Sequence, residues 1–167
     1  MEQLSLESWV MELRINMEDL WSPETKYHGT AVTLSDRISK GQCGPSSLVL
    51  AEALVNHGYD AYFCEGDAIF PQEKGKDVSI KNHCWVMIKN YYRNNGIIGD
   101  AIIDLTADQE GHSEKVVFKS KNELRKLNID YKESVSDGHK KPSQVDVKHV
   151  LERANILRDG LKKILIV

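Results

Sequence analysis

Hydrophobic residues recur at steps of three and four near both ends of the chain, which is the period of an amphipathic helix. The first such stretch covers residues 6–21, and Ser22 and Pro23 directly after it predict where the helix ends. The last stretch covers residues 147–161. We expect each of these segments to be a helix that buries one face.

A further helix is predicted around the apolar run from Leu48 to Val55. Pro45 suits the first turn of this helix, where its missing N–H is not needed. Gly58 suits the position just after the helix, where the left-handed conformation is common. We expect this segment to be the buried central helix.

Shorter runs between the central and last helices alternate between apolar and polar positions, the period of a β-strand. The predicted strands cover residues 59–65, 83–89 and 99–105. A polar loop is expected over residues 66–82, because it contains proline and glycine. The last two strands are predicted to pair as a hairpin around Asn94–Gly96.

Alternation along the second predicted strand separates its side chains into two faces. His83, Trp85 and Met87 fall on one face, and Cys84 and Val86 fall on the other. We therefore expect that His83 and Cys84 do not serve the same site.

The composition is that of an ordinary globular domain. Of 167 residues, 41% are hydrophobic and 28% are charged. We expect one domain over residues 1–167, with a catalytic core at about 40–109 and the terminal helices packed around it. No apolar run approaches the roughly 20 residues that span a membrane, and no secretory signal is visible. We therefore expect no membrane association and a cytoplasmic location.

Charge and cysteine content narrow the function classes further. The net charge is −3, and the basic cluster at residues 119–126 alternates with acidic residues. Nucleic acid is therefore not an expected partner. The three cysteines cannot all pair within one chain, so free thiols are expected in a reducing compartment. The oligomeric state stays open.

Cys43 stands between Gly41-Gln42 and Gly44-Pro45, directly before the apolar run of the central helix. A thiol at the first turn of a helix lies near unpaired backbone N–H groups and the positive end of the helix dipole. Both favour the thiolate, and the N–H groups can later hold an oxyanion. A buried structural cysteine does not need these flanking glycines. We predict that Cys43 is a nucleophile.

His83 and Asp104 supply the partners that such a nucleophile needs. They follow Cys43 in the order Cys, His, Asp, each on a predicted strand. His83 would act as the base, and Asp104 would fix its tautomer through the other ring nitrogen. Asp100 and Asp108 lie in the same segment and are alternatives for the acid.

Three further side chains are candidates for holding the substrate or the oxyanion. The backbone N–H of Cys43 is expected to be the first oxyanion donor. The side-chain amide of Gln42 or the indole N–H of Trp21 would be the second, and Trp85 is expected to contact the substrate. This chemistry requires no metal and no other cofactor.

Three short motifs resemble those of the transglutaminase-like branch of the papain-like cysteine enzymes. They are Gly41-Gln42-Cys43, His83-Cys84-Trp85-Val86 and Ile103-Asp104-Leu105-Thr106, within roughly residues 40–109. The resemblance implies an α+β fold in which a central helix carrying the cysteine packs on a small antiparallel sheet carrying the histidine and the aspartate. It also implies a Cys-His-Asp triad. Transglutaminases proper have an aromatic residue after the cysteine, where this chain has Gly44, so cross-linking of proteins is not specifically implied.

The sequence therefore predicts a thiol-dependent amide hydrolase or acyltransferase that forms a thioester with a protein or peptide substrate. Cysteine protease and glutamine deamidase chemistry both fit this description. The alternative is a catalytically silent domain of the same fold that binds a peptide or a partner protein. A zinc site using Cys43, Cys64, Cys84 and histidines is a third reading, which the lack of a Cys-x-x-Cys pair disfavours. In the catalytic reading, Cys64 and Cys84 are inert core thiols.

Overall fold

The computed structural model describes residues 5–27, 37–93, 96–134 and 138–165. Within these ranges the fold is α+β, with four α-helices and a six-stranded antiparallel sheet. The helices are α1 (Leu6–Leu20), α2 (Cys43–Asn56), α3 (Lys121–Lys126) and α4 (Lys148–Leu165). The strands are β1 (Ala61–Phe70), β2 (Val78–Arg93), β3 (Gly96–Asp104), β4 (Val117–Ser120), β5 (Asp130–Glu133) and β6 (His139–Lys140).

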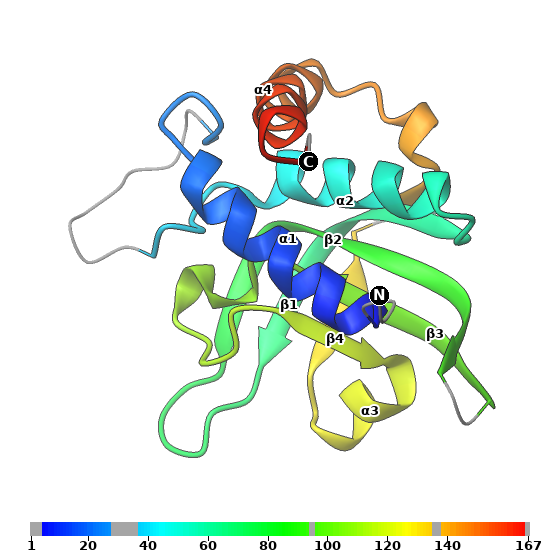
Figure 1. Cartoon of the computed structure of the whole chain (residues 1–167). Helices are drawn as coiled ribbons and strands as arrows, with labels where there is room; N and C mark the ends of the chain where they lie inside the picture. The colour runs from blue at the N-terminus through cyan, green and yellow to red at the C-terminus, as the bar shows by residue number, and fades with distance from the viewer. Residues whose placement is uncertain (1–4, 28–36, 94–95, 135–137, 166–167) are drawn as a thin grey trace.

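The sheet has the order β4-β3-β2-β1-β5, and β6 pairs with β1 beside β5. The long strands β1, β2 and β3 form its centre, and every recorded pairing is antiparallel. Helix α2 lies across one face of the sheet, with α1 and α4 beside it (Figure 1). This arrangement confirms that the helix carrying Cys43 packs on an antiparallel sheet.

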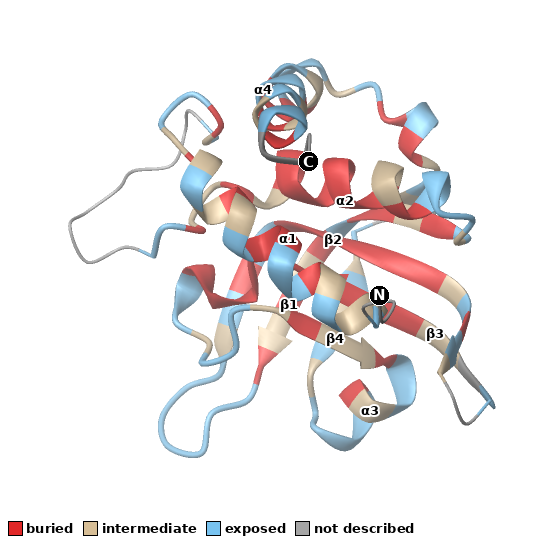
Figure 2. Ribbon diagram, in the orientation of Figure 1, coloured by how far each residue is buried: buried red, intermediate tan, exposed pale blue. Residues whose placement is uncertain are grey.

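The three long helices agree with the hydrophobic periodicity. Helix α1 ends at Leu20, and Trp21 is its C-cap residue, directly before Ser22 and Pro23. Helix α2 is buried over most of its length because the sheet covers one side and α4 covers another (Figure 2). Gly58, just after α2, has a φ of 86°, the left-handed conformation expected there.

The strands differ from the prediction between residues 66 and 82. That segment was expected to be a loop, but β1 continues to Phe70 and β2 begins at Val78. The expectation was wrong because apolar and polar residues keep alternating on both sides of the short turn that contains the proline and glycine. Strands β2 and β3 form the predicted hairpin, with Arg93 opposite Gly96. Asn94 and Asn95 of the expected turn lie outside the described residues.

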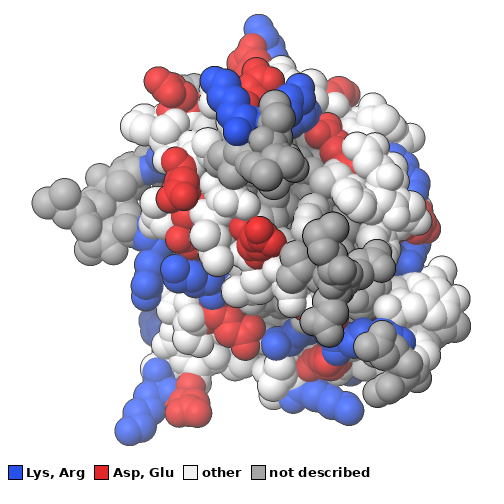
Figure 3. Space-filling model, in the orientation of Figure 1, with Lys and Arg blue, Asp and Glu red and all other residues white. Residues whose placement is uncertain are grey.

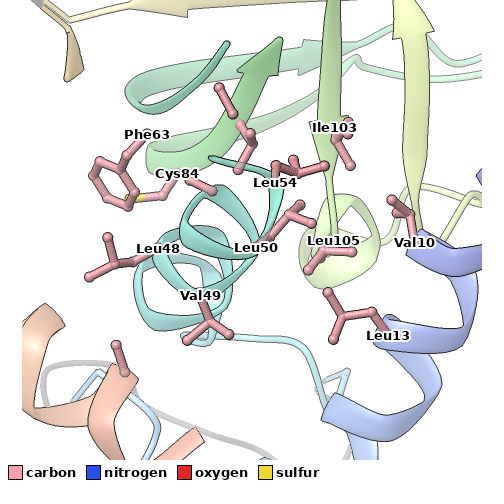
Figure 4. Packing of buried hydrophobic residues seen from close by; sticks show 14 of the residues in the cluster. Val10, Leu13, Leu48, Val49, Leu50, Leu54, Phe63, Cys84, Ile103 and Leu105 are labelled. Atoms are coloured by element: carbon pink, nitrogen blue, oxygen red, sulfur yellow. The ribbon is translucent and has the colours of Figure 1, made fainter. Parts of the chain in front are cut away.

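Two hydrophobic clusters lie on the two faces of the sheet. The larger one joins α1, α2 and α4 to the sheet, and Figure 4 shows α2 side chains between Phe63 and Cys84 on one side and Leu13 of α1 on the other. The smaller cluster includes Trp85, Met87 and Ile102 on the opposite face. Cys84 and Val86 belong to the larger cluster and Trp85 and Met87 to the smaller, so the predicted alternation along β2 is confirmed for these residues.

A close backbone contact fixes the sheet beside His83. Gly66 of β1 pairs with His83 on one side and with Glu133 of β5 on the other. A Cβ atom at Gly66 would lie 2.0 Å from the carbonyl oxygen of Lys132, so only glycine fits. The β1–β2 register shifts between Gly66 and Ala68, which places a bulge next to His83.

None of the helices in the described ranges is both long enough and apolar enough to cross a membrane. On the face seen in Figure 3, basic and acidic side chains are interspersed.

Candidate active site

Cys43 is the first residue of α2 and lies at the edge of a cavity of about 620 Å³. Gly41 before it has a φ of 78°, which lets the chain turn sharply into the helix. Gln42 makes no side-chain cap, whereas Ser5 and Ser120 cap α1 and α3. The first N–H groups of α2 are therefore not taken up by a capping side chain.

The cavity lies between the N-terminus of α2, strands β1 and β2, the turn at Ala107–Glu110 and helix α4. Its lining includes Cys43, Gly44, Phe63, Cys84, Gln109 and Arg153. Its volume falls in the range of sites that bind small molecules or a few residues of a peptide.

His83 and Asp104 form a buried pair behind the cavity. The Nε2 atom of His83 lies 2.6 Å from Oδ2 of Asp104, and both residues are 0% exposed. Asp104 also accepts hydrogen bonds from the backbone N–H of Thr106 at 2.9 Å and from the hydroxyl of Tyr131 at 2.8 Å. Strands β2, β3 and β5 thus hold the acid and the base in one orientation.

The pKa values of this pair reflect burial and mutual attraction. Burial by itself would lower the pKa of His83, but the charge of Asp104 and its hydrogen bond raise it to about 10. Burial by itself would raise the pKa of Asp104, but the positive His83 and the hydrogen bonds from Thr106 and Tyr131 bring it below its usual value. Asp104 is therefore a carboxylate that favours a protonated imidazole.

Both His83 and Cys84 act on the pKa of the Cys43 thiol. A hydrogen bond from Cys84 is the largest effect that lowers the pKa of Cys43; burial opposes it, and a hydrogen bond and the charge of His83 lower the pKa further. The net result is a pKa well below the usual value of a thiol. Cys43 thus has the electrostatic environment of a nucleophile.

The expectation that His83 and Cys84 do not serve one site is therefore wrong, since both act on Cys43. Alternation does send the two side chains to different faces of β2. The bulge opposite His83 adds local twist, however, and Asn82 before it has a φ of 50°. Cys43, at the first residue of α2, is affected by both side chains.

Gln109 is a site residue that the sequence reasoning missed. Its Nε2 atom lies 2.7 Å from Nδ1 of His83, and its Oε1 atom accepts from the N–H of Gly41 at 3.3 Å. In this orientation the amide can donate to Nδ1 only while that nitrogen carries no proton, with the ring proton on Nε2 toward Asp104. A proton on Nδ1 would displace the Gln109 amide. No spacing rule singled out this glutamine.

The structure does not bring Gln42, Trp21 or Trp85 to the described lining of the cavity. Gln42 donates its side-chain N–H to the carbonyl of Ser22 at 3.3 Å. Trp21 donates its indole N–H to the hydroxyl of Ser46 at 2.9 Å. Both donors are therefore committed elsewhere, and the structure supports neither as the second oxyanion donor.

Trp85 is buried in the smaller cluster on the far face of the sheet. Its ring packs edge-on against Tyr131, with 5.1 Å between the ring centroids. Its position lets it support His83, whose ring centroid lies 6.2 Å away, but not contact a substrate in the cavity.

The two alternative acids, Asp108 and Asp100, pair with groups other than His83. Asp108 is buried and binds the guanidinium of Arg14, with an N–O distance of 3.1 Å, and the hydroxyl of Ser39 at 2.7 Å. Asp100 lies 3.6 Å from the ammonium group of Lys121. Of the three aspartates, Asp104 is the one bonded to the histidine.

Cys43, Cys64 and Cys84 are free thiols. Burial raises the pKa of Cys64, so this thiol is unreactive by comparison with Cys43. Over the described ranges, no cluster of three or more His, Cys, Asp or Glu side chains could hold a metal ion, so the zinc reading has no ligand set there.

No protein-family model, curated protein or solved structure matches this chain. The chemistry of the site rests on the geometry of Cys43, His83, Asp104 and Gln109.

Proposed function

We propose that this protein is a thiol-dependent amide hydrolase or acyltransferase of the transglutaminase-like, papain-like type, with Cys43 as the nucleophile, His83 as the base and Asp104 as the acid that orients it. One observation carries the proposal: the buried pair of His83 and Asp104, 2.6 Å apart, adjoins a thiol at a helix N-terminus that opens into a cavity. The packing of α2 on the antiparallel sheet supports the same family.

In the first step, the Cys43 thiol gives its proton to Nδ1 of His83, and the sulfur attacks the carbonyl carbon of the substrate. A C–S bond forms and the carbonyl π electrons move to oxygen. The N–H groups at the start of α2 face the resulting oxyanion. Asp104 holds the imidazolium in place through Nε2–H.

In the second step, the imidazolium of His83 gives the proton to the leaving nitrogen, the C–N bond breaks, and a thioester remains on Cys43. Water or an amine then attacks the carbonyl carbon of the thioester while His83 takes a proton from it; a C–O or C–N bond forms, the C–S bond breaks, and Cys43 leaves as the thiolate. Hydrolysis of a peptide bond, deamidation of glutamine and transfer to an amine all follow this course. The substrate in each case is a protein or a peptide.

The side-chain amide of Gln109 can change its hydrogen-bond acceptor during these steps. While His83 is neutral, the Gln109 amide is bonded to Nδ1. When Nδ1 takes the proton of Cys43, it can no longer accept, and the released amide can donate to the oxyanion in the cavity it lines. Gln109 thus replaces Gln42 and Trp21 as the proposed second oxyanion donor.

The same contact favours the alternative function, a catalytically silent domain that binds a peptide or partner protein. If the Gln109 amide stays on Nδ1, His83 cannot accept a proton there. The cavity would then bind a ligand without attacking it. Both functions fit a reducing compartment such as the cytoplasm, because the three thiols are free.

Labelling and library screening test the proposal together. Native protein is treated with iodoacetamide near pH 6, and the modified cysteines are identified by mass spectrometry. We expect Cys43 to react faster than Cys64 and Cys84, because its pKa alone is lowered. A peptide library then reports cleavage or deamidation, with Cys43→Ala as the control. Equal or slower labelling of Cys43 would refute the nucleophile, and fast labelling without turnover would favour the silent domain.

A further inference from the structure

Arg153 is a buried cation in the wall of the cavity. It lies on α4 and is 5% exposed. Backbone carbonyls hold two of its nitrogens: Nε donates to His149 at 2.8 Å, and Nη1 donates to Thr25 and to Gly41, both at 3.3 Å. The guanidinium is therefore fixed, and Nη2 is left with two N–H donors.

Within the described residues Arg153 has no carboxylate partner and no acceptor for Nη2; the charge of the Cys43 thiolate acts on it, and the centre of the Tyr27 ring lies 5.6 Å from its guanidinium carbon. Arg14 and Arg158, by contrast, pair with carboxylates, Arg14 with Asp108 at 3.1 Å and Arg158 with Glu52 at 2.6 Å. A buried N–H donor without an acceptor is unfavourable. A carboxylate that enters the cavity would supply acceptors for the two Nη2 donors.

The other charges along the cavity are paired or reach water. Lys81 lies 2.8 Å from Asp67, Lys40 lies 3.7 Å from Glu110, and Glu65 is exposed. Attraction between such exposed groups is weakened by solvent. Arg153 is thus the positive charge in the described lining of this cavity that solvent screens least.

Nη2 of Arg153 lies next to Gly44, the residue directly after Cys43. A Cβ atom at Gly44 would lie 3.5 Å from Nη2 of Arg153 and 3.2 Å from Cγ2 of Val150. A larger side chain would displace the guanidinium. The free edge of Arg153 therefore lies against the first turn of α2, which carries Cys43.

We propose that Arg153 binds a carboxylate of the substrate next to the carbonyl that Cys43 attacks. The favoured substrates are then peptides with a free C-terminal carboxylate near the scissile amide, or with an Asp or Glu side chain there. A planar guanidinium held in one orientation is well suited to a carboxylate. This inference rests on the proposed function, since it takes Cys43 as the nucleophile.

Two alkylating reagents of similar size test this inference without a known substrate. Iodoacetate carries a carboxylate beside its reactive carbon, and iodoacetamide carries a neutral amide. Rates at Cys43 are compared with those of a small free thiol in the same buffer. We expect the iodoacetate-to-iodoacetamide ratio at Cys43 to exceed the free-thiol ratio about tenfold or more, the effect of one charged hydrogen bond. We also expect the iodoacetate rate to saturate with concentration.

Variants identify the group responsible. Arg153→Gln should return the ratio to the free-thiol value, and Arg153→Lys should retain part of the preference. Arg158→Gln is the matched control, because it removes one positive charge from the same helix on the side that faces Glu52; its ratio should equal that of the wild type. A wild-type ratio no larger than the free-thiol ratio would overturn the inference.

Acetate binding gives a readout that needs neither a reactive thiol nor a mutant of Arg153. In Cys43→Ser protein, acetate should shift the NMR signals of the Gly44 and Arg153 backbone amides saturably, and acetamide should not. If acetate shifts these signals but Cys43 of the wild type is inert, the assignment of Cys43 as the nucleophile is wrong and the anion site is supported. A reactive Cys43 without acetate shifts would disprove the anion site and keep the nucleophile. Peptides with free or amidated C-termini, with and without acidic side chains, then distinguish the two sources of the carboxylate.

Discussion

Replacing Asp104 by asparagine tests the centre of the proposed mechanism with little change in size. Oδ1 of Asp104 accepts from the N–H of Thr106 at 2.9 Å, and Oδ2 accepts from His83 at 2.6 Å and from Tyr131 at 2.8 Å. The oxygen of asparagine can keep the Thr106 bond, and its NH₂ group then meets Nε2 of His83. That nitrogen must lose its hydrogen to accept, which moves the proton to Nδ1. The base then has the wrong tautomer.

The expected loss follows from the charge that is removed. Two unit charges about 4 Å apart interact by ~4 kcal/mol at an effective dielectric constant of 20. Converted to a rate, this corresponds to a loss of about 10³. The negative Cys43 still attracts the imidazolium, and the N-terminus of α2 still stabilises the Cys43 thiolate. Both effects offset part of this loss. We therefore expect Asp104→Asn to lower both turnover and alkylation of Cys43 near pH 6 by a factor on the order of 10 to 10³.

The assay measures the second-order rate of iodoacetamide labelling and, once a substrate is found, kcat/KM, with circular dichroism to confirm folding. Asp100→Asn is the matched control, since it removes the same charge from the same strand but leaves His83 untouched; we expect no change. Tyr131→Phe removes one donor to Asp104 without removing the charge, so its effect should be about tenfold or less. A folded Asp104→Asn protein with labelling and turnover equal to the control would refute the role of Asp104.

Three further changes have distinct expected outcomes. Cys84→Ala removes the hydrogen bond that most lowers the pKa of Cys43, so the rise of Cys43 labelling with pH should move to higher pH; an unchanged profile would contradict this contact. Gln109→Ala should lower turnover by about 10² if its amide binds the oxyanion. Increased turnover would instead show that Gln109 blocks the base. Asp108→Asn leaves the buried Arg14 with Glu18 as its remaining charged partner and should lower the free energy of unfolding by about 1.5–3 kcal/mol, measured by urea titration; a change below 1 kcal/mol would contradict it.

Much of the local structure followed from periodicity in the sequence. The bounds of α1, the buried helix α2 and the alternation along β2 were predicted within a few residues, because side-chain spacing reflects the geometry of each element. The position of Cys43 at a helix start was predicted from its flanking glycines and the apolar run after it. These features depend on residues close together in the chain.

The partners of the reacting groups depend on contacts between distant residues. Tyr131 reaches Asp104 from β5, and Gln109 reaches His83 from the turn after β3. Arg153 reaches the cavity from α4 and lies next to Gly44. Side-chain partners of this kind are set by strand order, by the bulge opposite His83 and by the packing of α4 on α2. None of these features produces a periodic pattern of residues in the sequence. For that reason Gln42 and Trp21, the predicted oxyanion donors, form hydrogen bonds elsewhere, while His83 and Asp104 form a pair whose charge acts on Cys43.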